Sequence, residues 1–283
     1  MRLDRLATLY LFHPLNKRSG AAHQGVPVLM YHSISNADER GLHPYYRTVT
    51  APETFRDQME WLHRAGYSTL PLGDALGRLG SHEGTAKTLV ITFDDGYSDF
   101  YEHAFPVLQE FGFTATVYLP TAYIGDVSRK FKEKDCLTWS QVRELQREGI
   151  SFGSHTITHR TLDSLPETEL EIELEGSKAE IEEKTGVKVR SFAYPYAFPR
   201  DKLEFKRRLR GLLCKLGYED GVCTTIGIAD SSSDALFVPR LPMNSCDDTA
   251  LIEAKLCGSY DWLAGVQLAY KRLKTTANMW EKQ

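Results

Sequence analysis

Residues 89–99, LVITFDDGYSD, begin with a strand-like pattern and end with acidic side chains. The first five residues are apolar, aromatic or β-branched, which favours a buried strand. Two adjacent carboxylates, Asp94 and Asp95, then follow it, and a glycine comes directly after them. An Asp–Asp pair alone is more often a turn or a helix cap. At the end of a buried strand, however, charged side chains must be either solvated or part of a functional site, so this pair is a candidate site.

The rest of the chain alternates between strand-like and helix-like segments. Further strands are predicted at 26–32, 113–119, 150–154, 189–194, 221–225 and 237–241, with a weaker one at 67–70. Helices are predicted at 52–65, 98–111, 138–148, 166–185, 205–216 and 247–263. Such alternation is typical of parallel strands, in an open sheet or a closed barrel. We expect one α/β domain of seven or eight units, with its chemistry at the carboxyl ends of the strands.

Composition excludes several classes of protein. The 283 residues, 42% of them hydrophobic, can bury a substantial core. A net charge of −4 argues against a nucleic-acid-binding protein, which usually carries a basic face. The five cysteines include no CxxC pair, so neither a disulfide framework nor a cysteine zinc site is expected. Such cysteines fit a reducing compartment, so we predict a cytoplasmic protein. We also predict that it has no nucleic-acid partner.

The chain ends are predicted to flank one barrel domain. Residues 1–23 are interpreted as an N-terminal arm, 24–265 as the domain and 266–283 as a C-terminal tail. The apolar run at 9–12 is too short for a membrane span or a signal-peptide core. Peripheral membrane contact is left open, because the basic helix at 205–216 could touch an anionic surface as well as simply pack on the domain. The oligomeric state is not predicted.

A second polar cluster follows the predicted strand at 150–154. Residues 150–162, ISFGSHTITHRTL, place His155 and His159 four positions apart. An HxxxH pair alone is a weak signal, but two imidazoles and one aspartate form a typical catalytic zinc site with one position open for water. The other aspartate could then act as the base for that water.

Three motifs together resemble the polysaccharide deacetylase family, also called carbohydrate esterase family 4 or NodB-like. They are TFDDGY at 92–97, SHTITH at 154–159 and FAYPY at 192–196, and the resemblance spans roughly residues 26–241. It implies a single distorted (β/α)7 TIM-like barrel that removes acetyl groups from N-acetylated sugars with one divalent metal, zinc first and Ni, Co, Fe or Mn as alternatives.

The resemblance also implies residue roles. Asp94 corresponds to the general base, and Asp95, His155 and His159 correspond to the metal ligands. Pro195 shapes a loop, where the backbone N–H of Tyr196 helps to bind the oxyanion.

The chain departs from the common family pattern in two places. Many members carry an arginine where this chain has Ala193, so the residue that orients the base is left open. Arg240 is a candidate for this role. The equally weighted alternative is that Arg240 is an ordinary surface arginine. Many members also end with a histidine that acts as the acid, but no histidine follows His159. His32, in VPVLMYHSIS at 26–35, ends an early strand instead. This order resembles circularly permuted exopolysaccharide-processing members, in which such a histidine would protonate the leaving nitrogen.

The predicted function is hydrolysis of the N-acetyl groups of a glycan, a polysaccharide or a lipid-linked sugar precursor, with release of acetate. Asp94 would take a proton from water, and His32 would give one to the departing amine. Two alternatives stay open. One is a deacylase or amidase for a non-sugar C–N bond, and the other is a non-catalytic glycan-binding barrel. The motifs do not identify the sugar or its linkage.

Overall fold

The computed structural model of the chain describes residues 2–19, 25–81 and 85–267. Its central sheet contains β1 (Val28–Tyr31), β4 (Ser68–Thr69), β5 (Thr88–Phe93), β6 (Thr116–Leu119), β9 (Ser151–Ser154), β10 (Ser191–Ala193), β11 (Asp220–Ile226) and β12 (Val238–Pro242). Two small pairs lie outside it: β2 (Ser33–Ile34) with β3 (Val49–Thr50), and β7 (Lys130–Phe131) with β8 (Lys134–Asp135). Every predicted strand is present, and the weaker one is the short β4.

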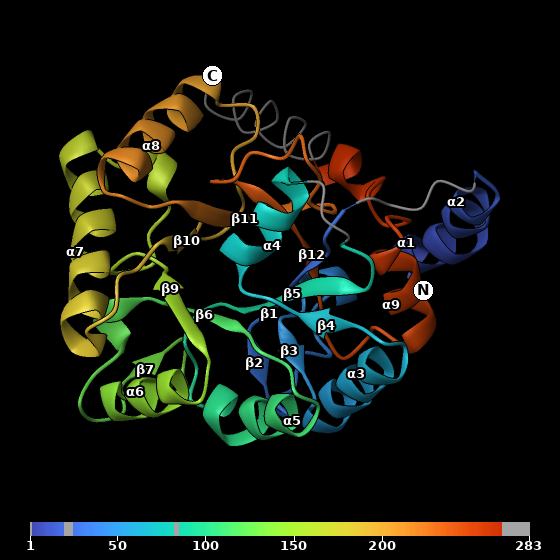
Figure 1. Cartoon of the computed structure of the whole chain (residues 1–283), viewed down its shortest axis with the longest axis horizontal. Coiled ribbons are helices and arrows are strands. Elements are labelled where there is room, and N and C mark those ends of the chain that lie inside the picture. The colour runs from blue at the N-terminus through green and yellow to red at the C-terminus, as the bar shows by residue number, and fades with distance from the viewer. Residues whose placement is uncertain (1, 20–24, 82–84, 268–283) are drawn as a thin grey trace.

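Seven of these strands close into a barrel. The order around the ring is β1, β12, β11, β10, β9, β6 and β5, and β5 pairs again with β1. All of these pairings are parallel. β4 lies outside the ring and pairs with the start of β5. Figure 1 looks down the barrel, with the helices around it. The predicted (β/α)7 barrel is therefore confirmed, and an irregular register between β11 and β12 contributes to its distortion.

Most helices connect successive strands and cover the outside of the barrel, whereas α4 lies at one end of it and α9 follows the last strand. They are α3 (Pro52–Arg64), α4 (Leu72–Gly80), α5 (Phe105–Glu110), α6 (Trp139–Arg147), α7 (Glu167–Thr185), α8 (Leu203–Lys215) and α9 (Thr249–Leu256). Short 3-10 turns lie at η2 (Pro44–Tyr46), η4 (Thr121–Tyr123) and η5 (Leu162–Ser164).

Two helix predictions needed correction, and one helix was missed. The helix expected at 98–111 is divided into a π-helical turn, η3 (Phe100–Ala104), and α5, because Pro106 provides no backbone N–H. The helix expected at 247–263 ends at Leu256, and Gly258 then adopts the left-handed conformation with a φ of 71°. α4 was not predicted at all, because its three glycines lower its helix propensity.

α4 fills the amino-terminal end of the barrel. Alternate residues of each strand point inward, and apolar ones from several strands pack in one cluster with the buried side of α4. The cluster contains Val26, Val28, Leu72, Ala75, Leu79, Val90, Tyr118, Ala193, Val222, Ala229 and Val238. In Figure 1, α4 accordingly lies over the centre of the ring. Polar inward-facing residues at the carboxyl ends of the strands therefore lie at the opposite end.

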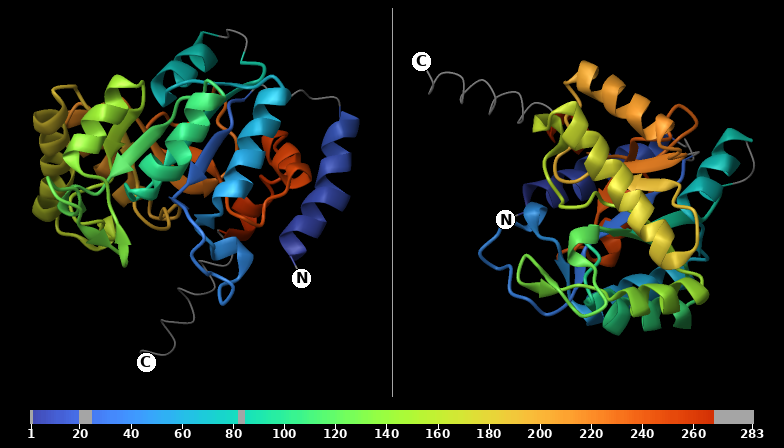
Figure 2. Two further views of the ribbon diagram at one scale, coloured as in Figure 1. Left: turned by 90° about the horizontal axis from the view of Figure 1, so that it is seen from below. Right: turned by 90° about the vertical axis from the view of Figure 1, so that its left-hand side faces the viewer.

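The described part of the N-terminal arm is helical and docked. It consists of α1 (Leu3–Ala7), η1 (Thr8–Phe12) and α2 (His13–Ser19), which lie beside α9 in Figure 2. Asp4 accepts a hydrogen bond from the Tyr260 hydroxyl at 2.9 Å, and the Phe12 ring stacks on that of Trp262 at 5.0 Å. Residues 20–24, which hold the predicted boundary, lie outside the described residues. The predicted tail at 266–283 does so too, apart from its first two residues.

The basic helix α8 packs on the barrel through one side, and several of its basic residues form ion pairs on the other. Leu209 and Leu213 are buried, whereas Lys206 and Arg210 both form ion pairs with Asp234. This arrangement favours the packing interpretation of α8 over membrane contact. Within the described ranges, no helix is long and apolar enough to span a bilayer.

Candidate active site

The carboxyl-terminal end of the barrel brings together the polar residues of the motifs. Asp94 and Asp95 follow β5, His155 follows β9, and His32 follows β1, whereas Arg240 lies within β12. Because β1 pairs with both β5 and β12, residues far apart in the sequence meet at this end. His32, Asp94 and Arg240 continue the inward-facing rows that begin with buried valines nearer the start of each strand.

Asp95, His155 and His159 form a compact group of potential metal ligands. One donor atom from each lies within 4.8 Å of the others, and all three side chains are buried. The Asp95 Oδ1 atom is 3.1 Å from His159 Nε2 and 3.6 Å from His155 Nε2. The three donors thus converge on one small volume from two different strand ends.

Hydrogen bonding leaves the right atoms of this group available for a cation. His155 Nδ1 lies 2.8 Å from the Ala193 carbonyl oxygen, so Nδ1 carries the proton and the Nε2 lone pair faces Asp95. Asp95 Oδ1 is buried and has no hydrogen-bond partner within the described part of the chain. A buried carboxylate oxygen without a partner is costly unless a ligand completes it.

The protonation states also fit a metal. Burial lowers the pKa of His155 to about 4, so its imidazole is neutral at pH 7. Burial would raise the pKa of Asp95, but the surrounding imidazoles, His159 first, hold it well below its usual range. Neutral imidazoles and an ionised carboxylate are the forms that bind divalent cations. The side chains present therefore fit the predicted metal, with a donor set that zinc accepts.

Asp94 is held by a buried arginine. Both terminal nitrogens of Arg240 donate to Asp94, each at 2.7 Å, and Arg240 Nε donates to the Cys223 carbonyl oxygen at 3.1 Å. Arg240 is fully buried, which excludes the surface-arginine alternative. Burial would raise the pKa of Asp94, but Arg240, His155 and His32 outweigh burial and lower it to about 2. Arg240, on β12, thus orients the ionised Asp94. Ala193, on β10, has no charge and cannot take this part.

His32 faces the same space. Its Nε2 atom lies 3.9 Å from Asp94 Oδ2, and its side chain remains 18% exposed. Burial lowers the pKa of His32 below its ordinary value, although Asp94 and Asp95 act in the opposite direction. The early-strand histidine therefore lies close to Asp94 and is partly exposed, as its proposed role requires.

Pro195 and Tyr196 follow β10 at the edge of the site. Tyr196 adopts a left-handed conformation with a φ of 57°, and its ring lies 4.5 Å from the ring of His159. Its carbonyl oxygen accepts a hydrogen bond from the Thr224 hydroxyl at 2.9 Å. Among the described residues, no protein acceptor is found for the Tyr196 N–H, so this donor is available to a ligand.

The histidine loop is strained and is supported by a buried glutamate that the sequence analysis missed. Thr156 and His159 have φ values of 67° and 55°, which β-branched and bulky residues rarely adopt. Glu173 of α7 is 5% exposed and accepts hydrogen bonds from the N–H groups of Ile157 and Thr158, each at 2.8 Å. Its position among many glutamates of a helical segment gave no sequence signal.

Two further residues contact Asp95. The hydroxyl of Tyr97, within the TFDDGY motif, donates to Asp95 Oδ2 at 3.0 Å. Lys132, in the turn between β7 and β8, places its Nζ 3.3 Å from the same oxygen. Tyr97 could have been inferred from the motif, but no sequence pattern connects Lys132 to the site.

Known proteins resemble this chain in sequence. The family model described as polysaccharide deacetylase matches residues 81–219. YxkH of Bacillus subtilis (strain 168) is 32% identical over 206 residues, which cover 72% of this chain and 66% of that protein. The poly-beta-1,6-N-acetyl-D-glucosamine N-deacetylase of Escherichia coli (strain K12) is 32% identical over 147 residues, 47% of this chain and 21% of that protein.

A solved structure supports the fold. The deacetylase PplD of Streptococcus pyogenes in complex with acetate matches with a TM-score of 0.71 and 24% identity, over 82% of this chain and 98% of that one. The chain spans just under two thirds of the Bacillus relative and about a fifth of the Escherichia relative. From the motifs and the sequence matches, the chain belongs to the polysaccharide deacetylase family.

Proposed function

We propose that this chain hydrolyses the N-acetyl groups of amino sugars in a glycan, a polysaccharide or a lipid-linked sugar precursor. The observation that carries this proposal is the group at one barrel end: a buried Asp–His–His set next to the Asp94–Arg240 pair and His32. The name of the Escherichia coli relative supports an N-acetylglucosamine polymer as the substrate class.

Asp95, His155 and His159 would hold one divalent metal, for which zinc is our first choice and Ni, Co, Fe or Mn are alternatives. When bound, a metal of this kind polarises the amide carbonyl and lowers the pKa of a water towards about 7, which brings that water within reach of a carboxylate base. The remaining chemistry belongs to the side chains and the backbone around it.

Asp94 would be the general base. Both of its oxygens accept from Arg240, yet each retains a second lone pair that can accept a proton from water. Arg240 keeps the carboxylate ionised and fixed in direction, so that no reorganisation is needed when the water attacks. The attack forms a bond from the water oxygen to the amide carbon.

His32 and Tyr196 would complete the reaction. The free N–H of Tyr196, which Pro195 and the left-handed backbone present, would donate to the developing oxyanion; such a donor is worth about 3–4 kcal/mol in other enzymes. His32 would protonate the nitrogen as the C–N bond breaks, because an amide nitrogen leaves poorly as an anion. Its lowered pKa makes the protonated imidazole a better acid. The products are acetate and a free amino sugar.

Two rival functions predict different results. A non-catalytic glycan-binding barrel would bind N-acetylated oligosaccharides without releasing acetate, although the complete set of buried polar groups argues against it. An amidase for a non-sugar C–N bond would share the same ligands and base and would differ only in its substrate. The cytoplasmic location also remains a prediction, and cell fractionation tests it.

The decisive experiment measures acetate and free amine over a substrate panel. The panel contains β-1,6-linked N-acetylglucosamine oligomers, other N-acetylated oligosaccharides, lipid-linked N-acetyl sugars and small non-sugar amides. We expect equal amounts of acetate and amine from at least one sugar class. Turnover of the small amides alone would support the amidase, and binding without turnover would support the glycan-binding barrel.

A matched pair of variants tests the two neighbouring aspartates. Asp94→Asn should retain the metal and lose most turnover, because the base is gone while the ligand set stands. Asp95→Asn should lose metal affinity itself. Equal metal content and full activity in both variants would contradict these roles.

A further inference from the structure

Lys132 brings a half-exposed charge against one of the proposed metal ligands. Its Nζ atom lies 3.3 Å from Asp95 Oδ2, and its side chain is 46% exposed, whereas that of Asp95 is 3% exposed. The Asp94–Arg240 pair next to it is buried as well. Lys132 thus reaches a buried carboxylate from the solvent side of the site.

The turn that carries Lys132 has an unfavourable backbone. β7 and β8 are joined by two residues, Lys132 and Glu133, whose φ angles are 48° and 64°. A two-residue turn with positive φ at both positions strongly favours asparagine and glycine there. Other residues in the left-handed region cost energy, and they cluster at functional sites. A lysine at this position is therefore a candidate for a functional role.

The hairpin is anchored against the ligand group. Phe131, the last residue of β7, is buried, and its ring lies 5.1 Å from the ring of His159. The Lys132 Nζ atom lies 4.5 Å from the centre of the Phe131 ring and 5.5 Å from that of Tyr196. Aromatic faces attract an ammonium group at such distances. These contacts hold the Lys132 charge beside Asp95.

The two oxygens of Asp95 have different surroundings. Oδ2 accepts a hydrogen bond from the Tyr97 hydroxyl at 3.0 Å and also contacts Lys132. Oδ1 faces the two imidazoles and has no hydrogen-bond partner among the described residues. Lys132 therefore leaves the oxygen for the ion free, and the buried Tyr97 already orients the carboxylate. What Lys132 adds is mainly positive charge.

The pairing of charges sets the electrostatics of the site. Asp94 is paired with Arg240, and Asp95 is paired with Lys132, so these two pairs carry no net charge. A divalent ion would then enter a region without a negative excess. The ammonium group next to its carboxylate ligand would repel the ion.

We propose that Lys132 is a counter-cation to Asp95 that weakens the affinity of the site for its metal and keeps the loaded site net positive. This inference rests on the metal site of the proposed function. A positive excess would favour the negative charge that develops on the amide oxygen during hydrolysis. A merely supporting role predicts the opposite sign, because loss of a group that orients a ligand usually costs metal affinity about 10–100-fold.

Zinc titration of the full chain in competition with a chelator, at pH 7.0 and low salt, tests the sign. Lys132→Met removes the charge from an exposed side chain, and we expect it to bind zinc about three- to tenfold more tightly than wild type. The difference should shrink at about 1 M salt, because the half-exposed charge is then screened. Lys132→Arg keeps the charge and should stay within about twofold of wild type.

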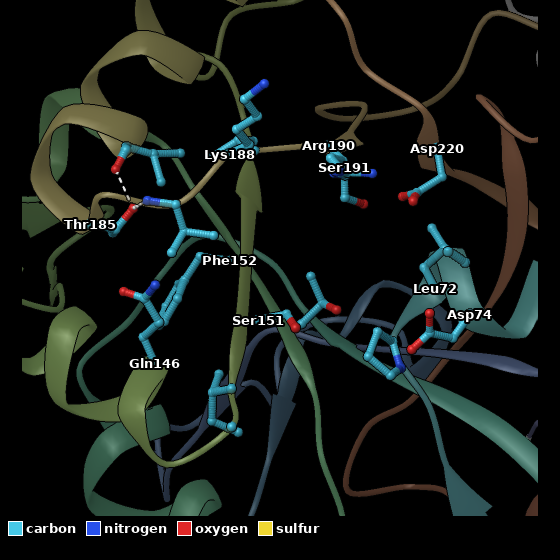
Figure 3. A pocket seen from close by; sticks show the side chains of 18 residues that line it. Leu72, Asp74, Gln146, Ser151, Phe152, Thr185, Lys188, Arg190, Ser191 and Asp220 are labelled. Atoms are coloured by element: carbon cyan, nitrogen blue, oxygen red, sulfur yellow. Dashed lines mark hydrogen bonds between the residues drawn. The ribbon is translucent and has the colours of Figure 1, made fainter.

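Lys188→Met is the matched control. It removes the same charge from an exposed lysine that lines a cavity at the opposite end of the barrel (Figure 3), so it should leave zinc affinity unchanged. If wild type binds zinc but Lys132→Met binds it equally or more weakly, the inference is overturned and the metal site stands. An equal gain in Lys188→Met also overturns it. A wild-type chain that binds no zinc overturns the proposed zinc site together with this inference.

Discussion

Replacement of Arg240 by methionine would test how the candidate base is held. Arg240 donates two hydrogen bonds of 2.7 Å to Asp94, and a third, at 3.1 Å, to the hydroxyl of Thr92. Methionine occupies a similar volume without the charge. The variant would therefore leave Asp94 buried without its cation, while the surrounding packing stays nearly filled.

The magnitude follows from the pKa of Asp94. That pKa is about 2 instead of 3.8, which corresponds to about 2.5 kcal/mol of stability. Because the folded pKa is depressed, this contribution is present above pH 3.8 and is lost as the pH falls through 2. Breaking a buried ion pair costs about 3–5 kcal/mol. We expect Arg240→Met to lower the free energy of unfolding by about 3 kcal/mol at pH 7, and by less at pH 4.

Urea unfolding at both pH values and the pH profile of acetate release provide the assay. Without Arg240, burial dominates and raises the pKa of Asp94, so the acid limb of kcat/KM should move up by about two pH units. Turnover should fall about 10–100-fold, as is usual when a residue that orients a catalytic group is lost. Arg240→Lys keeps the charge without the paired geometry and should give intermediate values. A loss of stability below about 1 kcal/mol together with an unshifted acid limb would refute this reasoning.

Three other changes have defined outcomes. His155→Ala should reduce metal affinity roughly tenfold or more. The measurement is the metal content after dialysis, and unchanged content would exclude His155 as a ligand. His32→Ala should retain fold and metal but lose roughly 10²–10⁴-fold in amide turnover, whereas an activated acetate ester should be much less affected; wild-type amide turnover would remove the acid role. Asp220→Asn should stabilise the protein above pH 6, by up to about 3 kcal/mol in urea unfolding, because burial raises the folded pKa to about 6 and the protonated form folds better. The difference in the free energy of unfolding should vanish near pH 4. A variant no more stable than wild type at pH 8 would show that burial of the charged carboxylate does not destabilise the protein.

Local patterns in the sequence determined the alternation of parallel strands with helices and the residues contributed by single strand ends, whereas closure into a barrel was expected only from the family resemblance. The predicted strands occur in the structure, because buried parallel strands require continuous apolar runs that are visible without a partner. Asp94, Asp95, His155 and His159 each lie within a few residues of a strand end. Their position at the site follows from the rule that parallel strands end at one face.

Only the tertiary structure decided what each of these groups contacts. Arg240 lies 146 residues from Asp94, and their pairing depends on the closure of the ring through β1. The same closure places His32 within 3.9 Å of Asp94. Lys132 reaches Asp95 from a hairpin outside the barrel, and a strand or helix pattern does not encode such a contact. α4 escaped the sequence analysis because its glycines weaken helix propensity, whereas packing of its apolar side inside the barrel mouth stabilises it in the fold.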